Sequence, residues 1–163
     1  MLPTSPAEPD RALRTALGRF ATGVTVVTAI DPDGHPIGLT VNSFAAVSLE
    51  PPLVLWSLHN SSHNFSAFKQ VAHYCINVLA ADQQDISNRF ATWPVDRFAN
   101  LSWQPGLGGA PVLAGCCAWF EVANHSQIPA GDHHTFFAQI ERFRADTTKA
   151  PLVFFGGQYQ ALR

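Results

Sequence analysis

The stretch Gly38-Leu39-Thr40-Val41-Asn42-Ser43-Phe44 lies between two segments that favour β-strands, residues 24–29 before it and residues 53–57 after it. Read as an extended strand, the stretch turns successive side chains to opposite faces. Thr40 and Asn42 then form a short polar row where the strand runs into a loop. Hydroxyl and carboxamide groups both donate and accept hydrogen bonds. This row therefore suits a neutral, hydrogen-bonding ligand surface better than it suits acid–base chemistry.

The same alternation divides the stretch into two groups, with Thr40, Asn42 and Phe44 on one face and Leu39, Val41 and Ser43 on the other. A second interpretation is that Asn42 and Ser43 are turn residues that close a strand. The residues alone leave both interpretations open.

The composition indicates one domain that shares its surface with another subunit. A chain of 163 residues buries roughly 68–70% of its unfolded surface, enough for one core. Charged residues make up only 13% of the sequence, about half the usual share. We therefore expect a homo-oligomer, although a large buried core is the other explanation for twelve Phe residues.

Charge and hydropathy argue against two classes of partner. The net charge is −2 and no basic stripe occurs, so nucleic acid is not an expected partner. No apolar run approaches the ~20 residues of a membrane span.

The N-terminus and the cysteines favour a cytoplasmic location. Residues 1–6 lack the basic and apolar regions of a signal peptide, and residues 1–9 are expected to form a flexible tail. Cys75, Cys116 and Cys117 are an odd set with an adjacent pair, so they predict no disulfide framework. All three lie in apolar runs, which favours buried, inert thiols.

The first half of the chain predicts one helix and then a hairpin. Pro9 and Asp10 are expected to open the helix, with Asp10 as N-cap and Gly23 as its stop. Its apolar face is expected to carry Leu13, Ala16, Leu17 and Phe20. Residues 24–29 form the first hairpin strand, and the turn Asp31-Pro32-Asp33-Gly34 leads to a second strand over 35–41. Pro36 places that second strand at a sheet edge.

The middle of the chain predicts a buried strand, a polar loop and a capped helix. Residues 53–58 are apolar on both faces, which predicts a central strand. After the loop 59–64, a helix follows, with Phe65, Phe68 and Val71 at helical spacing. Ser61 or Ser62 is expected to cap it, and its backbone N–H groups would form an anion site. The other interpretation is a helix cap with no ligand.

The rest of the chain predicts mostly strands. Asp82 is expected to cap a short helix with Ile86 and Phe90, and residues 104–109 and 126–130 are expected to be connections. The expected strands are residues 74–79, 116–123, 134–141 and 152–155. Many short strands with few helices predict a mainly β chain that forms a closed or partly closed β-barrel.

Several kinds of chemistry lack their usual motifs. There is no Gly-x-Ser-x-Gly elbow for a nucleophilic serine, and no His-x-His or Cys-x-x-Cys metal spacing. His133 and His134, near Asp132 and His125, are expected to point to opposite faces of a strand, so they cannot readily share an ion. No metal site is expected. Polar loops at strand ends with aromatic neighbours fit an aromatic, phosphate-bearing ligand.

Together these pieces resemble the short-chain flavin reductases, whose flavin-reductase-like domain is an FMN-binding split β-barrel of Greek-key type. The resemblance runs from about Arg11 to Leu162, so the domain is expected over residues 10–163. The matching pieces are residues 20–28, 38–44, 47–54, 77–80, 96–98, 131–133 and 151–155 with Tyr159.

The resemblance implies an activity and partners. Such a protein is an NAD(P)H:flavin oxidoreductase, which reduces FMN or FAD with NADH or NADPH and supplies the reduced flavin to a partner monooxygenase. It is usually a homodimer with the flavin near the subunit interface. The hydride chemistry belongs to the two cofactors.

The resemblance also implies roles for residues. His133 would lie over the flavin and help to place the nicotinamide, which makes it the catalytic candidate. Thr40, Asn42 and Ser43 would line the edge of the flavin ring and the ribityl–phosphate chain. The phosphate would be held by Ser57, Ser61 and Ser62, with backbone N–H groups at the helix start. Further cofactor-binding candidates are Val41, Leu58 and Asn64. Residues expected to close the site are Arg97, Phe98 and, at its margin, Tyr159.

The chain departs from the family pattern in two places. His134 stands where Thr is frequent, and residues 138–140 are Ala-Gln-Ile where Gly-Glu-Val is frequent. Asn60 and His63 stand in the serine loop where many members carry Arg. These changes predict modest flavin affinity.

Three alternatives for the function stay open: a flavoprotein without turnover, a split-barrel enzyme with another biosynthetic reaction, and an enzyme that resembles pyridoxamine-phosphate oxidase.

Overall fold

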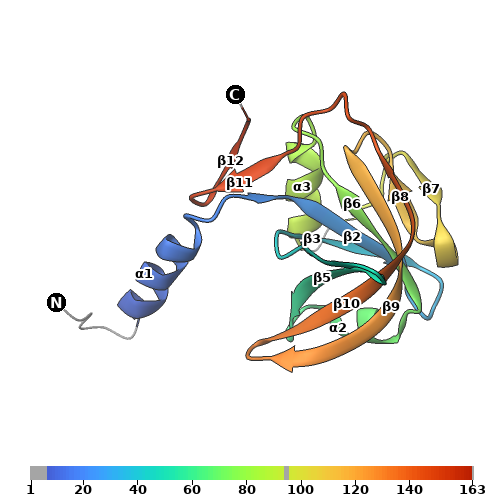
Figure 1. Ribbon diagram of the computed structural model, residues 1–163, viewed down its shortest axis with the longest axis horizontal. Coiled ribbons are helices and arrows are strands. Elements are labelled where there is room, and N and C mark those ends of the chain that lie inside the picture. The colour runs from blue at the N-terminus through green and yellow to red at the C-terminus, as the bar shows by residue number, and fades with distance from the viewer. Residues whose placement is uncertain (1–6, 94–95, 163) are drawn as a thin grey trace.

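A computed structural model describes residues 7–93 and 96–162 (Figure 1). Residues 1–6 of the predicted tail lie outside this range. The helical elements are α1 (Ala7–Leu17), α2 (Phe65–Gln70), α3 (Gln84–Ala91) and the 3₁₀ turn η1 (Leu107–Gly109). The strands of the main sheet are β2 (Thr25–Ile30), β3 (Pro36–Val41), β4 (Ala45–Leu49), β5 (Pro52–His59), β6 (His73–Val78), β9 (Ala118–Ala130) and β10 (His133–Ala145). Shorter strands are β1 (Thr22–Gly23), β7 (Trp103–Pro105), β8 (Pro111–Leu113), β11 (Val153–Phe155) and β12 (Gln158–Gln160).

One antiparallel sheet of seven strands forms the body of the molecule, in the order β3-β2-β6-β9-β10-β5-β4. Strands β1, β11 and β12 form a small second sheet, and β7 and β8 pair with each other. The prediction of a mainly β chain with a few helices is therefore confirmed. None of the helices in the described part of the chain combines the length and apolar character that a membrane crossing requires.

The two edge strands of the main sheet, β3 and β4, are consecutive in the chain, and no ladder joins β3 to β5 in the described residues. Ser43, in the connection between them, bonds to β5 instead. Its Oγ accepts a hydrogen bond from the backbone N–H of Ser57 (2.9 Å) and donates one to the Ser57 carbonyl (3.1 Å). Ser43 faces Ser57 in continuation of the β4–β5 register, which pairs Ala45 with Leu55. A side chain thus makes both bonds that a backbone pair would make in a ladder.

A buried polar network joins three strands inside the core. Asn77 of β6 is fully buried. Its Nδ2 donates to the Val26 carbonyl (2.9 Å) and to Thr28 Oγ1 (3.0 Å), and its Oδ1 accepts from the Leu113 N–H (2.8 Å). Because every polar atom of this amide has a partner, the network fixes β2, β6 and β8 relative to one another.

The first helix differs from its prediction at both ends. It begins at Ala7, before the expected N-cap Asp10, and ends at Leu17. Gly18 follows, with its N–H bonded to the Arg14 carbonyl, whereas the expected stop Gly23 lies in β1. The predicted helix extended too far because Phe20, which lies after the end of the helix, fits the same helical period.

The strands also show differences. Residues 126–130, expected as a loop, continue β9, because a long β10 lies alongside to pair with them. In β5 only alternate residues, Val54, Trp56 and Leu58, are fully buried, so the prediction of burial on both faces is wrong for this chain. An antiparallel sheet covers one face with its core and leaves the other more open.

The predicted helix caps are wrong, and one cysteine is more open than expected. The N-cap of α2 is Asn64 and that of α3 is Gln83, neither with a side-chain capping bond, so Ser61, Ser62 and Asp82 do not cap them.

Cys75 and Cys116 are buried, and burial raises the pKa of the Cys116 thiol to about 12. Cys117 is only half-buried.

We predict that Asn77→Ala lowers the free energy of unfolding by about 2–4 kcal/mol, because it leaves buried donors and acceptors without partners. Equilibrium urea unfolding measures this change. Gln158→Ala, at an exposed strand position, is the control and is expected to stay within about 0.5 kcal/mol of the parent. Equal stability of the two variants would contradict the role of the Asn77 network.

Candidate functional site

A polar pocket of about 300 Å³ lies where β3 runs toward β4, against the ends of β5 and β10. This volume is at the lower end of the range for small-molecule sites. The structure brings eight of the predicted site residues together here: Thr40, Val41, Asn42, Ser43, Ser57, Leu58, Ser62 and His133. Leu39 and His59 also line it and were not among the predicted residues.

A second pocket of about 220 Å³ shares Thr40, Val41 and Asn42 with the first. Its far wall includes Ser87 of α3 and the predicted residue Tyr159. The Thr40 hydroxyl donates to the Ser87 carbonyl (2.7 Å), and the Ser87 and Tyr159 hydroxyls are 2.7 Å apart. The two pockets therefore flank one strand end, and α3 holds that strand end in place.

The outer edge of β3 borders these pockets with unpaired backbone groups. The Gly38 carbonyl accepts from Asn64 Nδ2 (3.2 Å) and from Arg97 Nη1 (2.6 Å) rather than from β2. Backbone groups in a strand change sides at each residue, so the N–H and C=O of Thr40 lie on this same open edge. Thr40 can therefore offer a backbone donor and acceptor to a planar ligand.

Arg97 and Phe98, which were predicted to close the site, have other contacts. Besides Gly38, Arg97 donates to the Thr92 carbonyl through Nε (3.2 Å) and Nη2 (2.9 Å). Burial lowers the pKa of Arg97 from its usual value. Phe98 packs edge-on against Phe90, at a ring distance of 5.1 Å, and lines neither pocket. These residues fasten α3 and its following loop to β3.

The serine loop after β5 is already hydrogen-bonded to itself. The N–H groups of Asn60, Ser61, Ser62 and Asn64 donate to Asp132, His59, His59 and Ser62 respectively. These four N–H groups of the loop already have partners, so an anion site here would draw on the first turn of α2, which stays a prediction. The Ser62 hydroxyl, which accepts from Asn64, keeps its own proton to offer to a ligand.

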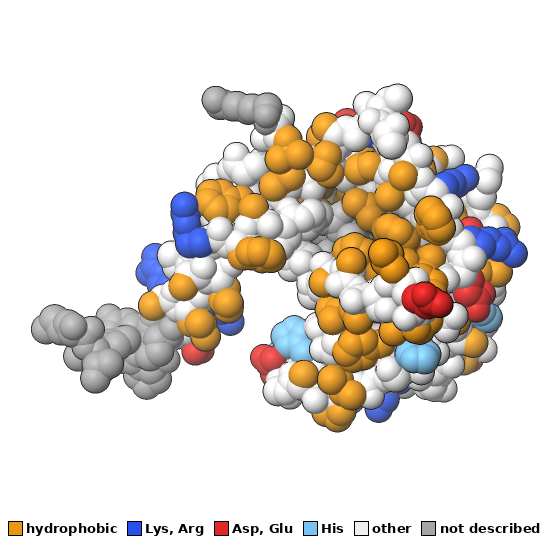
Figure 2. Space-filling model, viewed as in Figure 1, with side chains coloured by type: hydrophobic (Ala, Val, Ile, Leu, Met, Phe, Trp, Pro, Cys, Tyr) orange, Lys and Arg blue, Asp and Glu red, His pale blue; other side chains and the backbone are white. Residues whose placement is uncertain are grey.

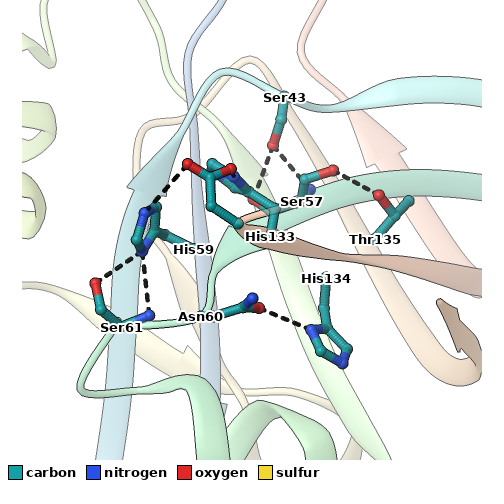
Figure 3. Close-up of polar contacts among 9 residues, drawn as sticks. Ser43, Ser57, His59, Asn60, Ser61, His133, His134 and Thr135 are labelled. Atoms are coloured by element: carbon teal, nitrogen blue, oxygen red, sulfur yellow. Dashed lines mark hydrogen bonds and ion pairs between the residues drawn. The ribbon is translucent and has the colours of Figure 1, made fainter. Parts of the chain in front are cut away.

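His59 and His133 line the larger pocket, and both lie beside Asp132; Figure 3 labels the two histidines. His133 Nδ1 donates to Asp132 Oδ1 at 2.6 Å, and His59 Nε2 is 3.5 Å from Asp132 Oδ2. The hydrogen bond from His133, helped by the nearby charges of both histidines, holds the pKa of Asp132 below its usual value. His59 and His133 are paired in the β5–β10 register, so their side chains share a face with Ser57 and Thr135.

His59 is a residue that the sequence interpretation missed, although the signal was present. The sequence suggested that the strand ends at residue 58 and that His59 begins a loop. One more residue of strand, as in β5, places His59 on the same face as Ser57 by simple alternation.

The pocket is built to bind through neutral groups. Neither Lys nor Arg is among the residues that line the two pockets. Within the described ranges, no three His, Cys, Asp or Glu side chains are grouped closely enough to hold a metal ion. A flat heteroaromatic ring with carbonyl and N–H groups along one edge fits this donor and acceptor set.

Another hollow of about 300 Å³ lies apart from this site, among Trp103, Trp119 and Arg144. The Arg144 guanidinium stacks on Trp119 at 4.3 Å, and the Trp119 N–H donates to the Leu113 carbonyl. None of the predicted site residues lines it.

Comparison with known proteins identifies the family. The model of the flavin reductase like domain matches residues 17–163, nearly the whole chain. The chain belongs to this family. The predicted resemblance is therefore confirmed, and the open seven-stranded sheet is this flavin reductase domain's form of the split barrel.

Relatives of this flavin reductase domain include reductases of several systems. It is 47% identical over 152 residues to the FMN reductase (NADH) SmoA of Agrobacterium fabrum, covering 93% of this chain and 86% of SmoA. It is 43% identical over 149 residues to the reductase component of the trigonelline monooxygenase of Acinetobacter baylyi, covering 91% of this chain and 48% of that protein. The chain spans about half the length of the first curated relatives it matches, with shares of 43%, 48% and 59%.

Solved structures share the fold over the full chain. Nitrilotriacetate monooxygenase component B of Mycobacterium thermoresistibile superposes with a TM-score of 0.93 at 34% identity, covering 98% of this chain and 89% of that one. The NADH:FAD oxidoreductase SgcE6 of Streptomyces globisporus, in complex with NAD and FAD fragments, gives 0.91 at 32% identity, covering 100% and 98%.

Two of the departures from the family pattern contact each other. Asn60 Oδ1 lies 2.8 Å from His134 Nδ1, and the His134 ring packs edge-on against Phe65 at 4.8 Å (Figure 3). His63, a third departure, stacks on Trp93 at 4.4 Å. The contacts of His134 lie on the side of β10 opposite to His133.

We predict that Ser43→Ala lowers the free energy of unfolding by about 1–3 kcal/mol, because both backbone groups of Ser57 lose their partner. The Ser57 amide should also exchange its hydrogen faster, since its N–H loses the acceptor that Ser43 provides. Hydrogen exchange and urea unfolding measure the two effects. Ser126→Ala, at an exposed position of β9, is the control. Unchanged exchange at Ser57 would contradict this role of Ser43.

Proposed function

We propose that this chain is an NAD(P)H:flavin oxidoreductase that reduces FMN or FAD and supplies the reduced flavin to a partner monooxygenase. The observation that carries this proposal is the polar pocket around Thr40–Ser43, in a chain of the flavin reductase family. Names of relatives point the same way, since they include an FMN reductase that uses NADH and the reductase components of flavin-dependent monooxygenases.

The pocket residues divide the work of holding a flavin. The open backbone edge at Thr40 and the Asn42 side chain would face the polar edge of the ring. The Ser62 hydroxyl would face the phosphate, in place of the Arg that this loop lacks. Neutral donors hold a phosphate less tightly than a guanidinium fork does. Such a site suits a flavin that is bound, reduced and released.

The bound flavin and nicotinamide would supply the redox chemistry, and the protein would contribute placement. His133 lies at the pocket rim, half-exposed, where it can help to orient a second ring over the first. Hydrogen-bond donors at Thr40 and Asn42 would stabilise negative charge that develops at the polar ring edge. No side-chain acid is needed beside the ring.

We further propose that the chain forms a homodimer through its exposed apolar surface. Leu13, Leu17 and Phe20, on and just after α1, are 59%, 65% and 78% exposed. The helix projects away from the barrel (Figure 1), and apolar side chains gather along it and over the barrel face (Figure 2). Leu49 on β4 is 94% exposed. Apolar surface of this kind favours a protein–protein interface.

A cytoplasmic location of the protein stays a prediction.

We predict that the purified chain oxidises NADH or NADPH at a rate that depends on added FMN or FAD. Asn42→Ala should weaken flavin binding by about 3- to 10-fold, the effect of one hydrogen bond. Absorbance at 340 nm follows the reaction, and quenching of flavin fluorescence measures binding. Gln104→Ala, outside both flavin pockets, is the matched control.

The outcomes separate the rival functions. Flavin binding without nucleotide oxidation would select a flavoprotein that holds its ligand without turnover. Absence of flavin binding would refute the proposal. Light scattering tests the homodimer, since Leu17→Glu with Phe20→Glu should shift the mass from two chains to one.

A further inference from the structure

A chain of polar contacts connects Ser61, His59, Asp132 and His133 along the pocket rim, and the proposed function assigns a role only to His133 (Figure 3). The side chains of His59 and His133 are 49% and 42% exposed, and both line the pocket. His59 comes from β5 and Asp132 from the turn before β10. Two elements far apart in the sequence thus meet at this point.

Ser61 determines which nitrogen of His59 carries the proton. The backbone N–H of Ser61 donates to His59 Nδ1 at 3.1 Å, and the Ser61 hydroxyl lies 2.7 Å from the same nitrogen. A backbone N–H can only donate, so Nδ1 must hold a lone pair there. Neutral His59 therefore carries its proton on Nε2.

The protonated nitrogen of His59 faces Asp132. Nε2 is 3.5 Å from Asp132 Oδ2, longer than a well-formed hydrogen bond, so in this state it is a contact between a dipole and a charge. Contacts of this kind often shorten when a ligand fills a site. The other carboxylate oxygen accepts from His133 Nδ1. In the described part of the chain, His133 Nε2 has no such partner and is the nitrogen left for a ligand.

We propose that His59 is a positioning residue: its Nε2–H holds the Asp132 carboxylate, which in turn holds His133 with Nε2 directed to the ligand. This inference rests on the proposed function and adds a residue to it. The backbone does not need His59 for this arrangement, because Asn60 N–H donates to the Asp132 carbonyl at 2.9 Å. His59 therefore controls the side chains and not the turn, and its replacement should leave the fold intact.

Two substitutions separate the two nitrogens of His59. In His59→Asn the amide reaches the place of Nδ1 and keeps a partner for Ser61, but nothing reaches Asp132. In His59→Gln the amide N–H reaches the place of Nε2 and can donate to Asp132. We expect kcat/KM for NADH to fall about 10-fold in His59→Asn, the effect of a lost hydrogen bond to a charged group, and to recover to within about 3-fold in His59→Gln. The flavin Kd should change less than kcat/KM in both variants.

Nuclear magnetic resonance tests the same inference without turnover. Long-range ¹H–¹⁵N correlation of the imidazoles should show His59 protonated on Nε2, with the assignment made by the loss of its signals in His59→Gln. The side-chain signals of His133 should shift in His59→Asn and stay close to the parent in His59→Gln.

The results decide the inference in either case. A proton on His59 Nδ1 would overturn it, as would equal activity in the Asn and Gln variants. If the parent chain shows no flavin-dependent oxidation of NADH, the proposed function fails. The tautomer of His59 and the response of His133 would then still decide whether His59 holds the Asp132–His133 pair.

Discussion

The pair between Ser43 and the backbone of Ser57 is the constraint on which the site depends. The main sheet has two free edges, β3 and β4, and the chain passes from one to the other within three residues. A full backbone ladder between β3 and β5 would pair the outer backbone groups of β3 and leave none for a ligand. By making both bonds with its side chain, Ser43 fastens the β3–β4 connection to β5 and leaves the outward backbone groups of Thr40 without a strand partner. The pocket is therefore a product of incomplete closure of the sheet.

The sequence predicted the type of most elements because their physical signals are local. The Asp31–Gly34 turn is built as expected: the Asp31 carboxylate accepts from the N–H groups of Asp33 and His35. Pro36 begins an edge strand, where its missing N–H costs nothing. The alternation of side chains along a strand is also a local signal, and it correctly predicted that Thr40 and Asn42 lie together, at the pocket.

Other differences come from tertiary contact that no local pattern encodes. Phe44 does not share a face with Thr40 as alternation predicted, because β3 ends at Val41 and the turned chain stacks Phe44 on Phe120. Residues 126–130 are a strand only because β10 pairs with them. The guanidinium of Arg97, a residue that the resemblance implies would close the site, is bound by the carbonyls of Thr92 and Gly38. Gly38 lies in a distant segment of the chain, so the sequence around Arg97 gives no sign of it.

His133 and His134 lie on opposite faces of β10, so the pocket residue and one of the chain's departures from the family pattern are separated by the strand. One face of this strand end carries His133 with Asp132 and His59, and the other carries His134 with Asn60 and Phe65. A histidine in place of Thr at position 134 therefore acts on the core side of the strand, away from the ligand. The outer face continues from Ser57 to Leu55 and Leu53, which are only half-buried in this chain. A ligand at the pocket thus lies at one end of a partly open apolar surface on the outer face of the sheet.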